Sequence, residues 1–222
     1  MANRHSANRH SANRHSIWTV VVAAGAGTRF GGAKQYLELA GVRVVDRSVA
    51  VAAAVSDGVV VVVPPADVEA ESARLGDAAV VAGGASRAAS VRNGLEAVPH
   101  DAAIICVHDA ARPLAGADIY ERVVHEVRSG AAGAVPVVPV TDTIRRVDGG
   151  VVDRSTLQAV QTPQAFRAEL LRVAHAGADD ATDDASLVEA AGHAVVAVEG
   201  NPRNIKITQP DDLAAAEAWL AT

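Results

Sequence analysis

The chain has 222 residues and a formal net charge of −6, with 50% apolar and 21% charged residues. That length favours one domain, which can build its own hydrophobic core without disulfide or metal support. A membrane-spanning protein and a disulfide scaffold are excluded, because no apolar run is long enough to cross a bilayer and Cys106 is the single cysteine. The lone thiol predicts a reducing, cytoplasmic setting. Negative charge argues against a nucleic-acid binder.

Residues 1–16 contain three copies of Ala-Asn-Arg-His-Ser, a five-residue period that matches neither a helix nor a strand. The repeat contains no apolar anchor, so we expect a disordered leader, with residues 17–222 forming a single domain. A metal site built from the repeated histidines is the weaker interpretation. Without the three leader arginines the net charge becomes −9, and the whole chain has only two lysines, Lys34 and Lys206. An acidic body that binds a polyphosphate must concentrate such cations at its site.

Beyond residue 16, short apolar runs alternate with helical segments. The predicted strands are Thr19–Ala24, Val59–Val63, Ala79–Ala82, Ile104–Val107, Ala134–Val140 and Ala194–Val198. The predicted helices are Asp46–Val55, Ala66–Leu75, Ser86–Val98, Asp118–Arg128, Ala168–Ala176, Asp184–Ala191 and Pro210–Leu220. This alternation predicts a Rossmann-like α/β fold, a mostly parallel sheet sandwiched by helices, with ligands at the carboxyl ends of the strands.

One segment, residues 141–157, breaks the alternation. Asp148-Gly149-Gly150 is a turn signal flanked by short runs of apolar and polar residues, which predicts a β-hairpin arm projecting from the body. A two-stranded arm is marginally stable alone, so it must pack on something. A second subunit is the natural candidate, and packing on its own domain is the alternative.

The first predicted strand leads into Ala23-Ala24-Gly25-Ala26-Gly27-Thr28-Arg29-Phe30-Gly31-Gly32-Ala33-Lys34. Glycines allow a backbone to approach a ligand, and successive amides can cradle phosphate oxygens. The dinucleotide fingerprint fails because Phe30 occupies its third glycine position, and the P-loop fails because Lys34 is followed by Gln35. What remains is a glycine loop that carries Arg29 and Lys34, two cations suited to a reacting polyphosphate.

A second motif, Val107-His108-Asp109-Ala110-Ala111-Arg112-Pro113, follows the strand Ile104–Val107. A carboxylate at the carboxyl end of a strand is well placed to hold Mg²⁺ against nucleotide phosphates, so Asp109 is the candidate metal ligand. The alternative for Asp109 is a helix cap. His108 is interpreted as a packing or hydrogen-bonding residue, and Cys106 as a small core residue.

Three further segments carry candidates. In Gly83–Ser90, Ser86 is a helix cap and Ser90 is a candidate contact to a nucleobase or ribose. Thr182-Asp183-Asp184 begins a helix, and an N-cap would explain it fully. Asn204–Thr208 resembles a short strand that ends near Lys206.

Together these segments resemble the 2-C-methyl-D-erythritol 4-phosphate (MEP) cytidylyltransferase family of the non-mevalonate isoprenoid pathway. The likeness runs from about Thr19 to Leu220 and rests on seven ordered blocks: AAGAGTRF…KQY, VHDAARP, TDTI, VDRSTL, QTPQAF, TDDAS and NIKITQPDDL. The chain departs from the family at Phe30, where methionine is common, and in the short stretch between Arg29 and Lys34. These differences bear on how the loop closes over the substrate and not on the chemistry of the reaction.

The resemblance implies a reaction of MEP with CTP that gives CDP-methylerythritol and pyrophosphate, with Mg²⁺ as cofactor. By the same resemblance, Arg29, Lys34 and Lys206 are catalytic. The implied CTP-binding residues are Ala23, Ala24, Gly25, Gly83, Ser90, Asp109 and Ala110. The implied MEP-binding residues are Asp109, Arg112, Thr143, Arg154, Thr162 and Thr182, and Asp109 also holds the metal. Because the attacking phosphate is already an anion, no strong general base is expected.

The family is a homodimer whose arm reaches into the partner's site, where Thr143 and Arg154 of this chain would act. Asp142 and Asp183 are satisfied by turn and cap roles. A cytidylyltransferase for a pentitol phosphate such as ribitol 5-phosphate is the nearest alternative, and a nucleotide sensor without catalysis is another. A dinucleotide-dependent oxidoreductase is disfavoured by Phe30. Because the chain ends at Thr222, we expect the form without a fused cyclodiphosphate synthase domain.

Overall fold

The computed structural model describes residues 16–25, 27, 30–176 and 183–221. The strands are β1 (Ile17–Val22), β2 (Glu38–Leu39), β3 (Val42–Arg43), β4 (Gly58–Val63), β5 (Ala79–Ala82), β6 (Ile104–Asp109), β7 (Gly133–Pro139), β8 (Ile144–Arg145), β9 (Val151–Val152), β10 (Gln158–Val160), β11 (Gln164–Arg167) and β12 (Val195–Glu199). The helices are α2 (Val44–Val55), α3 (Val68–Arg74), α4 (Arg87–Ala97), α5 (Ala117–Arg128), α6 (Ala168–Ala176), α7 (Asp184–Ala190) and α8 (Pro210–Leu220). Of the predicted leader, only Ser16 lies within the described residues.

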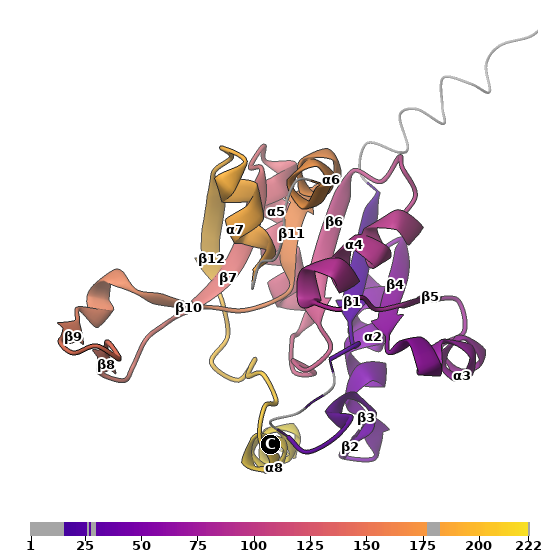
Figure 1. Ribbon diagram of the computed structural model, residues 1–222, viewed down its shortest axis with the longest axis horizontal. Helices are drawn as coiled ribbons and strands as arrows, with labels where there is room; N and C mark the ends of the chain where they lie inside the picture. The colour runs from indigo at the N-terminus through magenta and orange to yellow at the C-terminus, as the bar shows by residue number, and fades with distance from the viewer. Residues whose placement is uncertain (1–15, 26, 28–29, 177–182, 222) are drawn as a thin grey trace, which may run out of the picture.

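The body is a single mostly parallel sheet covered by helices (Figure 1). Its strand order is β10-β7-β11-β6-β1-β4-β5, and β12 pairs with β7 outside this order. Strands β1, β4, β5, β6, β7 and β12 run in one direction, whereas β10 and β11 run against them. The predicted α/β class is confirmed, and the parallel strands bring their carboxyl ends to one edge.

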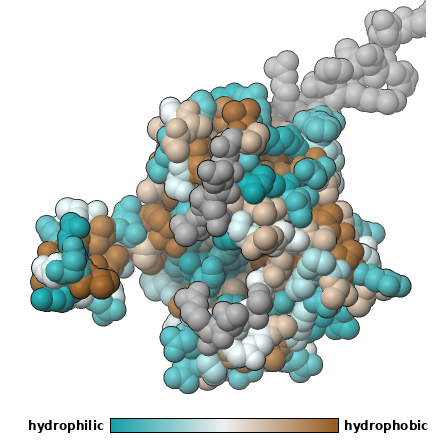
Figure 2. Space-filling view, viewed as in Figure 1, coloured by the Kyte–Doolittle hydropathy of each residue, from teal (hydrophilic) through white to brown (hydrophobic). Residues whose placement is uncertain are grey.

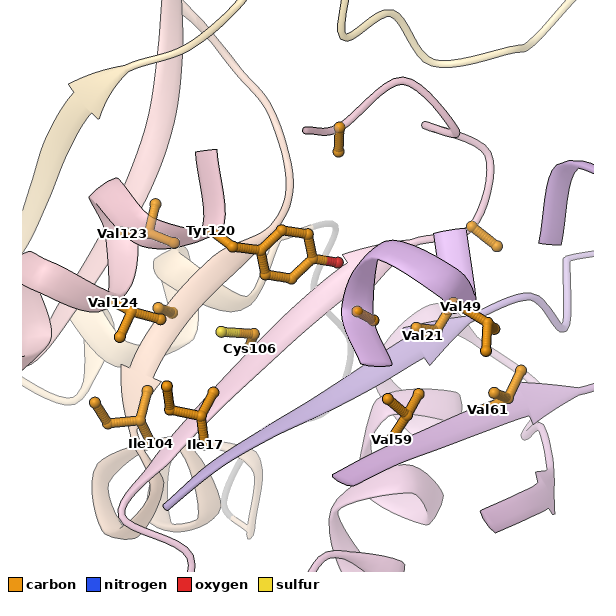
Figure 3. Packing of buried hydrophobic residues seen from close by; sticks show 14 of the residues in the cluster. Ile17, Val21, Val49, Val59, Val61, Ile104, Cys106, Tyr120, Val123 and Val124 are labelled. Carbon is orange, nitrogen blue, oxygen red and sulfur yellow. The ribbon is translucent and has the colours of Figure 1, made fainter. Parts of the chain in front are cut away.

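Both faces of the sheet are buried at the central strands β1, β4 and β6, which explains why these strands are nearly continuous apolar runs rather than alternating ones. Val20 and Val62 pack on one face with α4, α6 and α7, whereas Val21 and Val61 pack on the other with α2 and α5. Figure 3 shows the second of these clusters, between the sheet and the two helices. All four valines are fully buried, and each stabilises the fold by about 1.5–3 kcal/mol.

Between β7 and β10 the chain leaves the sheet and forms the hairpin β8–β9, which extends away from the body (Figure 1). Ile144 pairs with Val152, and Arg145 with Val151. The turn uses Gly149 and Gly150 at φ angles of 113° and 81°, a region that side chains other than glycine rarely adopt. We call residues 141–157 the arm.

Four short parts of the chain differ from the sequence-based expectations. The antiparallel strands β10 and β11 and the hairpin β2–β3 were not predicted, because their two to four residues carry no clear periodicity. Asn204–Thr208, expected to be strand-like, is irregular: Ile207 N–H donates to the Ala111 carbonyl at 2.8 Å and Thr208 N–H to the Asp212 carboxylate at 2.7 Å. These bonds tie the segment to a loop and a helix cap instead of a neighbouring strand.

Helix α8 anchors that segment. Ala216 of α8, Ile207, Leu39 and Val44 form a small buried cluster, and the cap of α8 uses Asp212 as an acceptor. None of the helices in the described part of the chain has the length and apolarity needed to span a bilayer.

Candidate active site

A pocket of about 490 Å³ opens at the carboxyl edge of the sheet. Its lining comes from the segments that follow β1, β5 and β6, together with Lys206 from the segment before α8. The lining residues are Val22, Ala23, Ala24, Gly25, Gly27, Phe30, Lys34, Gln35, Gly84, Ala85, Ser86, Arg87, Ser90, Asp109, Ala110, Ala111 and Lys206. Parallel strands predict a ligand site at this edge.

The described part of the glycine loop is a tight turn closed on Gly27. The N–H groups of Phe30, Gly31 and Gly32 point at the Gly27 carbonyl, at 2.8, 3.0 and 3.3 Å. Gly27 has a φ of +62°, and a Cβ there would lie 1.9 Å from the Gly32 carbonyl oxygen. Glycine is therefore required at this position by both backbone conformation and space.

The two lysines of the chain both line this pocket although 172 positions separate them. Lys34 begins a 3-10 turn directly after the loop, and its Nζ donates to the Ile207 carbonyl at 2.6 Å. Lys206 Nζ donates to Asp109 Oδ2 at 2.6 Å. Both lysines therefore lie at one site, as we expected of an acidic chain that binds a polyphosphate.

Asp109, the last residue of β6, is held between two cations. Lys206 binds one carboxylate oxygen, and Arg87 Nε approaches the other at 3.2 Å. Burial alone would raise the pKa of Asp109, but Arg87 and Lys206 outweigh burial and hold the pKa well below its ordinary value. Asp109 is therefore a carboxylate at neutral pH. It does not cap a helix, since the N-cap of α5 is Gly116.

Behind Asp109, Thr162 and His108 fix the end of β6. Thr162 Oγ1 accepts the Asp109 backbone N–H at 3.0 Å and lies 3.1 Å from His108 Nδ1. Burial lowers the pKa of His108 to about 4, so the ring is neutral at physiological pH. His108 is thus a buried hydrogen-bonding residue, as the sequence indicated. Thr162 is buried and does not line the pocket.

The segment after β5 forms the opposite wall. Ser86 caps α4 by accepting the Ala89 N–H at 3.2 Å, as predicted. Ser90 Oγ donates to the Ser86 carbonyl at 2.9 Å and accepts the Gly84 N–H at 3.1 Å. Gly83 is not part of the lining, but a Cβ on it would lie 2.3 Å from Ala24 Cβ, so it allows the segment after β5 to approach the segment after β1.

Several predicted residues lie elsewhere. Arg112 donates to the carbonyls of Asn204 and Val160 at 2.8 and 3.2 Å, so it braces the loops beside Asp109 without lining the pocket. Thr143 and Arg154 are exposed on the arm, outside the pocket of their own chain, and Arg154 donates to the Thr141 carbonyl.

Arg29 and Thr182 fall outside the described residues. Asp142 is exposed on the arm, and Asp183 is the N-cap of α7, where it accepts the Ala185 N–H at 2.6 Å. Both observations agree with the turn and cap roles considered for these residues.

Sequence reasoning missed Arg87 and its buried partner Asp184. Arg87 Nη2 lies 2.8 Å from Asp184 Oδ2, and the side chain of Asp184 is 1% exposed. Arg87 stands inside the predicted segment Gly83–Ser90, at the first position of a helix that follows a strand. That position was a usable signal for a residue facing the sheet edge. The separation of 97 positions between Arg87 and Asp184 gave no signal of their pairing.

Among the described residues, no three His, Cys, Asp or Glu side chains gather into a metal-binding group. Asp109 is the single acidic residue among the described residues that line the pocket. One ionised carboxylate is consistent with Mg²⁺, which binds through one or two carboxylates together with substrate phosphates and water.

The fold and this pocket place the chain in a general class of proteins. It is an α/β protein with a site of the kind that binds nucleotides, in which a glycine turn and several cations surround one carboxylate at the sheet edge. The family model described as 2-C-methyl-D-erythritol 4-phosphate cytidylyltransferase (IspD) matches residues 17–222. The chain belongs to this family.

Named relatives agree with that assignment. The chain is 48% identical over 212 residues to the 2-C-methyl-D-erythritol 4-phosphate cytidylyltransferase of Rhodococcus jostii, covering 90% of this chain and 93% of that protein. It is 48% identical over 220 residues to the bifunctional enzyme IspD/IspF of Anaeromyxobacter dehalogenans, covering 90% of this chain but 56% of that protein. The chain thus spans just over half the length of this bifunctional relative. The crystal structure of 2-C-methyl-D-erythritol 4-phosphate cytidylyltransferase from Thermus thermophilus superposes with a TM-score of 0.79 at 36% identity, covering 93% of this chain and 100% of that one.

Proposed function

We propose that this protein transfers CMP from CTP to MEP. An oxygen of the MEP phosphate attacks the α-phosphorus of CTP, a new P–O bond forms, and the bond to the β-phosphate oxygen breaks. The products are 4-diphosphocytidyl-2-C-methyl-D-erythritol and pyrophosphate. The observation that carries the proposal is the convergence of Lys34, Lys206 and Asp109 on one pocket in a chain of the cytidylyltransferase family.

The proposed roles follow from where charge develops. Lys34 and Lys206, with Arg29 outside the described residues, would stabilise the crowded negative charge at the α-phosphorus. Ala23, Ala24, Gly25 and Ala110 line the pocket and would face cytosine and the phosphate groups. The N–H groups of Ala23 and Ala110 donate to the Val62 and Val22 carbonyls, so the proposed backbone donors to the ligand are Ala24 and Gly25. Ser90, at the opposite wall, would contact the base or ribose, with Gly83 allowing the close approach of that wall.

Mg²⁺ belongs to the proposal as a cofactor held by Asp109 and by the phosphates of CTP. When bound, it would neutralise phosphate charge and orient the triphosphate. Asp109 itself stays ionised because Arg87 and Lys206 flank it, and we propose that it also orients the hydroxyl groups of MEP. The reaction needs no strong general base, since the nucleophile is already a phosphate anion.

The arm carries the proposal of a homodimer. Thr143 and Arg154 are exposed, and so are the apolar side chains of Val147, fully, and Val151, at 64%. Figure 2 shows apolar surface on the projecting arm. Exposed apolar groups on a two-stranded hairpin are typical of a surface that a partner covers. We propose that the arm reaches the pocket of a second copy. There Arg154 would bind the MEP phosphate through a forked pair of hydrogen bonds and Thr143 would donate its hydroxyl.

Thr182 would contact MEP in the proposed site, whereas Arg112 and Thr162 would act from behind it, Arg112 by bracing the neighbouring loops and Thr162 by fixing the end of β6 at Asp109. The single cysteine is buried and unpaired, as is typical of proteins from a reducing compartment, and we propose the cytoplasm as the location of the reaction.

The first test is pyrophosphate release by the purified protein with CTP, Mg²⁺ and either MEP or ribitol 5-phosphate. Release with MEP alone is expected. Release with ribitol 5-phosphate alone would keep the cytidylyl transfer but overturn the acceptor, and CTP binding without release from either would favour a nucleotide sensor.

Lys34→Ala tests transition-state stabilisation. We expect turnover to fall by roughly 10²-fold or more while CTP affinity changes much less, because a group that acts on developing charge changes kcat more than binding. Arg74→Ala is the matched control, since it removes a cation that is 58% exposed and does not line the pocket. Equal losses of turnover and affinity in Lys34→Ala would contradict the role.

Arg154→Ala tests the shared site. The apparent KM for MEP should rise while that for CTP stays unchanged, and Arg146→Ala, an exposed arginine of the same arm, should change neither. At an MEP concentration far below the raised KM, mixing the impaired Lys34→Ala and Arg154→Ala proteins under subunit exchange should increase activity, because a mixed dimer contains one intact site. No increase from dimers shown to have exchanged would refute the shared site.

A further inference from the structure

A chain of buried charges runs from the pocket carboxylate into the body of the protein. Arg87, the first residue of α4, joins two carboxylates: its Nε lies 3.2 Å from Asp109 Oδ1 and its Nη2 lies 2.8 Å from Asp184 Oδ2. Asp184 is the first residue of α7, and its other oxygen lies 3.0 Å from His175 Nε2 near the end of α6. With Lys206 on the far oxygen of Asp109, five side chains form one line.

The inner end of this line is fully enclosed. The side chains of Asp184 and His175 are 1% and 2% exposed, and neither residue lines the pocket. Burial would raise the pKa of Asp184, but the His175 hydrogen bond and the Arg87 guanidinium outweigh burial and keep the pKa below its ordinary value. Asp184 is therefore a buried anion at neutral pH.

Stability alone is a poor explanation for such an arrangement. The desolvation of buried ions offsets most of their attraction, so apolar side chains of similar volume would stabilise this layer equally well. The neighbours on α6 and α7, Leu171 and Val188, are themselves apolar and fully buried. The chain of charged side chains differs from these apolar neighbours because it connects to Asp109, the carboxylate that lines the pocket.

The geometry of Arg87 indicates what Asp184 does. A guanidinium is planar, so fixing Nη2 on Asp184 also fixes the direction in which Nε donates to Asp109. Arg87 lines the pocket as well, within reach of any polyphosphate bound there. Without an anion behind it, Arg87 would be free to turn from Asp109 toward the phosphates.

We propose that Asp184, supported by His175, is a positioning residue for the pocket: it holds Arg87 in the orientation that keeps Asp109 fixed beside Lys206. The inference rests on the proposed function, because its consequence is measured in the transfer reaction. Neither Asp184 nor His175 touches the pocket, so both act through Arg87.

Asp184→Asn tests the inference, because the amide keeps the shape of the side chain and removes its charge. Arg87 then loses one of its two anionic partners and the surroundings of the pocket become one unit more positive. We expect kcat to fall about 10-fold, since small misplacements of reacting groups are costly in rate. The KM for CTP should stay equal or fall, because an added positive charge attracts a polyphosphate.

Glu71→Gln is the matched control. Glu71 is also a buried carboxylate paired with an arginine, with Arg43 Nη1 at 2.7 Å, but neither member of that pair lines the pocket. This variant should lose thermal stability and keep wild-type kcat and KM. A merely structural role for Asp184 would give the same pattern as Glu71→Gln, and that result would overturn the inference.

His175→Phe provides a second measurement if Asp184→Asn does not fold. It keeps a ring and removes the donor to Asp184, so kcat should fall about threefold with no rise in the KM for CTP. Wild-type kcat in this variant would then refute the positioning role. Wild-type protein that releases no pyrophosphate with MEP would refute the proposed function instead. In that case calorimetric titration with CTP and Mg²⁺ still tests the inference, since Asp184→Asn must bind at least as tightly as wild type and weaker binding contradicts it.

Discussion

Gly83→Ala perturbs the wall of the pocket through packing alone. A Cβ on Gly83 would lie 2.3 Å from Ala24 Cβ, 3.1 Å from Ser90 Oγ and 3.4 Å from the Val63 carbonyl oxygen. Ordinary contact between such atoms begins at 3.4 Å, so Ala24 and the start of the segment after β5 must separate by about 1 Å. Because the obstacle is a Cβ fixed to the backbone, rotation of a side chain cannot relieve it.

The expected consequences concern both stability and binding. Overpacking of a close contact costs about 1–3 kcal/mol in the free energy of unfolding. Ala24 and Ser90 both line the pocket, and a displacement of about 1 Å there should weaken CTP binding by roughly 10-fold. Urea unfolding followed by circular dichroism measures the first effect, and calorimetric titration with CTP measures the second.

Gly58→Ala is the matched control for this experiment. Its Cβ would lie 2.4 Å from the Trp18 ring, so it overpacks β4 against β1 at their amino ends, away from the pocket. It should lose less stability than Gly83→Ala, because the Trp18 ring can move aside, and it should bind CTP like the wild type. The reasoning is refuted if folded Gly83→Ala binds CTP within twofold of wild type, or if both variants weaken binding equally.

The other predictions concern the core and a helix cap. Phe166→Ala should cost about 3–5 kcal/mol in urea unfolding, because the ring is fully buried against Gly133; a loss below 1 kcal/mol would contradict this packing. Burial raises the pKa of the Cys106 thiol to about 12, so Ellman's reagent at pH 8 should label it only after unfolding, and rapid labelling of native protein would contradict its burial. Asp212→Ala should cost about 1 kcal/mol by removing the acceptor for three N–H and O–H donors at the start of α8. Burial would raise the pKa of Asp212, but bonds from Thr208 and Gln209 outweigh it and lower the pKa. Its contribution is therefore complete above the unfolded pKa of about 3.9 and is lost as pH falls through the lower folded value, so the variant's stability should fall less steeply in acid than that of the wild type.

The parts of the fold that could be predicted are those whose physics is local. The runs of valine around Val20 and around Val61 each indicate a strand buried on both faces, because their residues are apolar without alternation. Asp109 could be assigned to the ligand-binding edge because a polar residue directly follows such a run. Lys34 and Lys206 could be paired only through composition and family resemblance, since the separation between them carries no geometric information.

The parts that could not be predicted depend on distant partners. Gln164–Arg167 forms β11 because it fits between β6 and β7, although its four residues have no strong strand pattern. Lys206 was expected to end a strand, but its segment is held by a loop carbonyl and by Asp212. Asp184 has the sequence position of a helix-start residue and the structure of a buried ion partner. Local spacing cannot separate these two roles.

The distribution of charge connects these observations. The part of the pocket lining that the structure describes contains three cations, Lys34, Arg87 and Lys206, and one anion, Asp109, in a chain whose formal net charge is −6. An acidic surface discourages nonspecific anion binding, so a locally positive pocket gains selectivity for polyphosphates. Cations placed so close together repel one another unless an anion separates them. Asp109 lies between Lys206 and Arg87, and Asp184 lies on the far side of Arg87, so the two carboxylates allow the cations to be held in fixed positions before any substrate arrives.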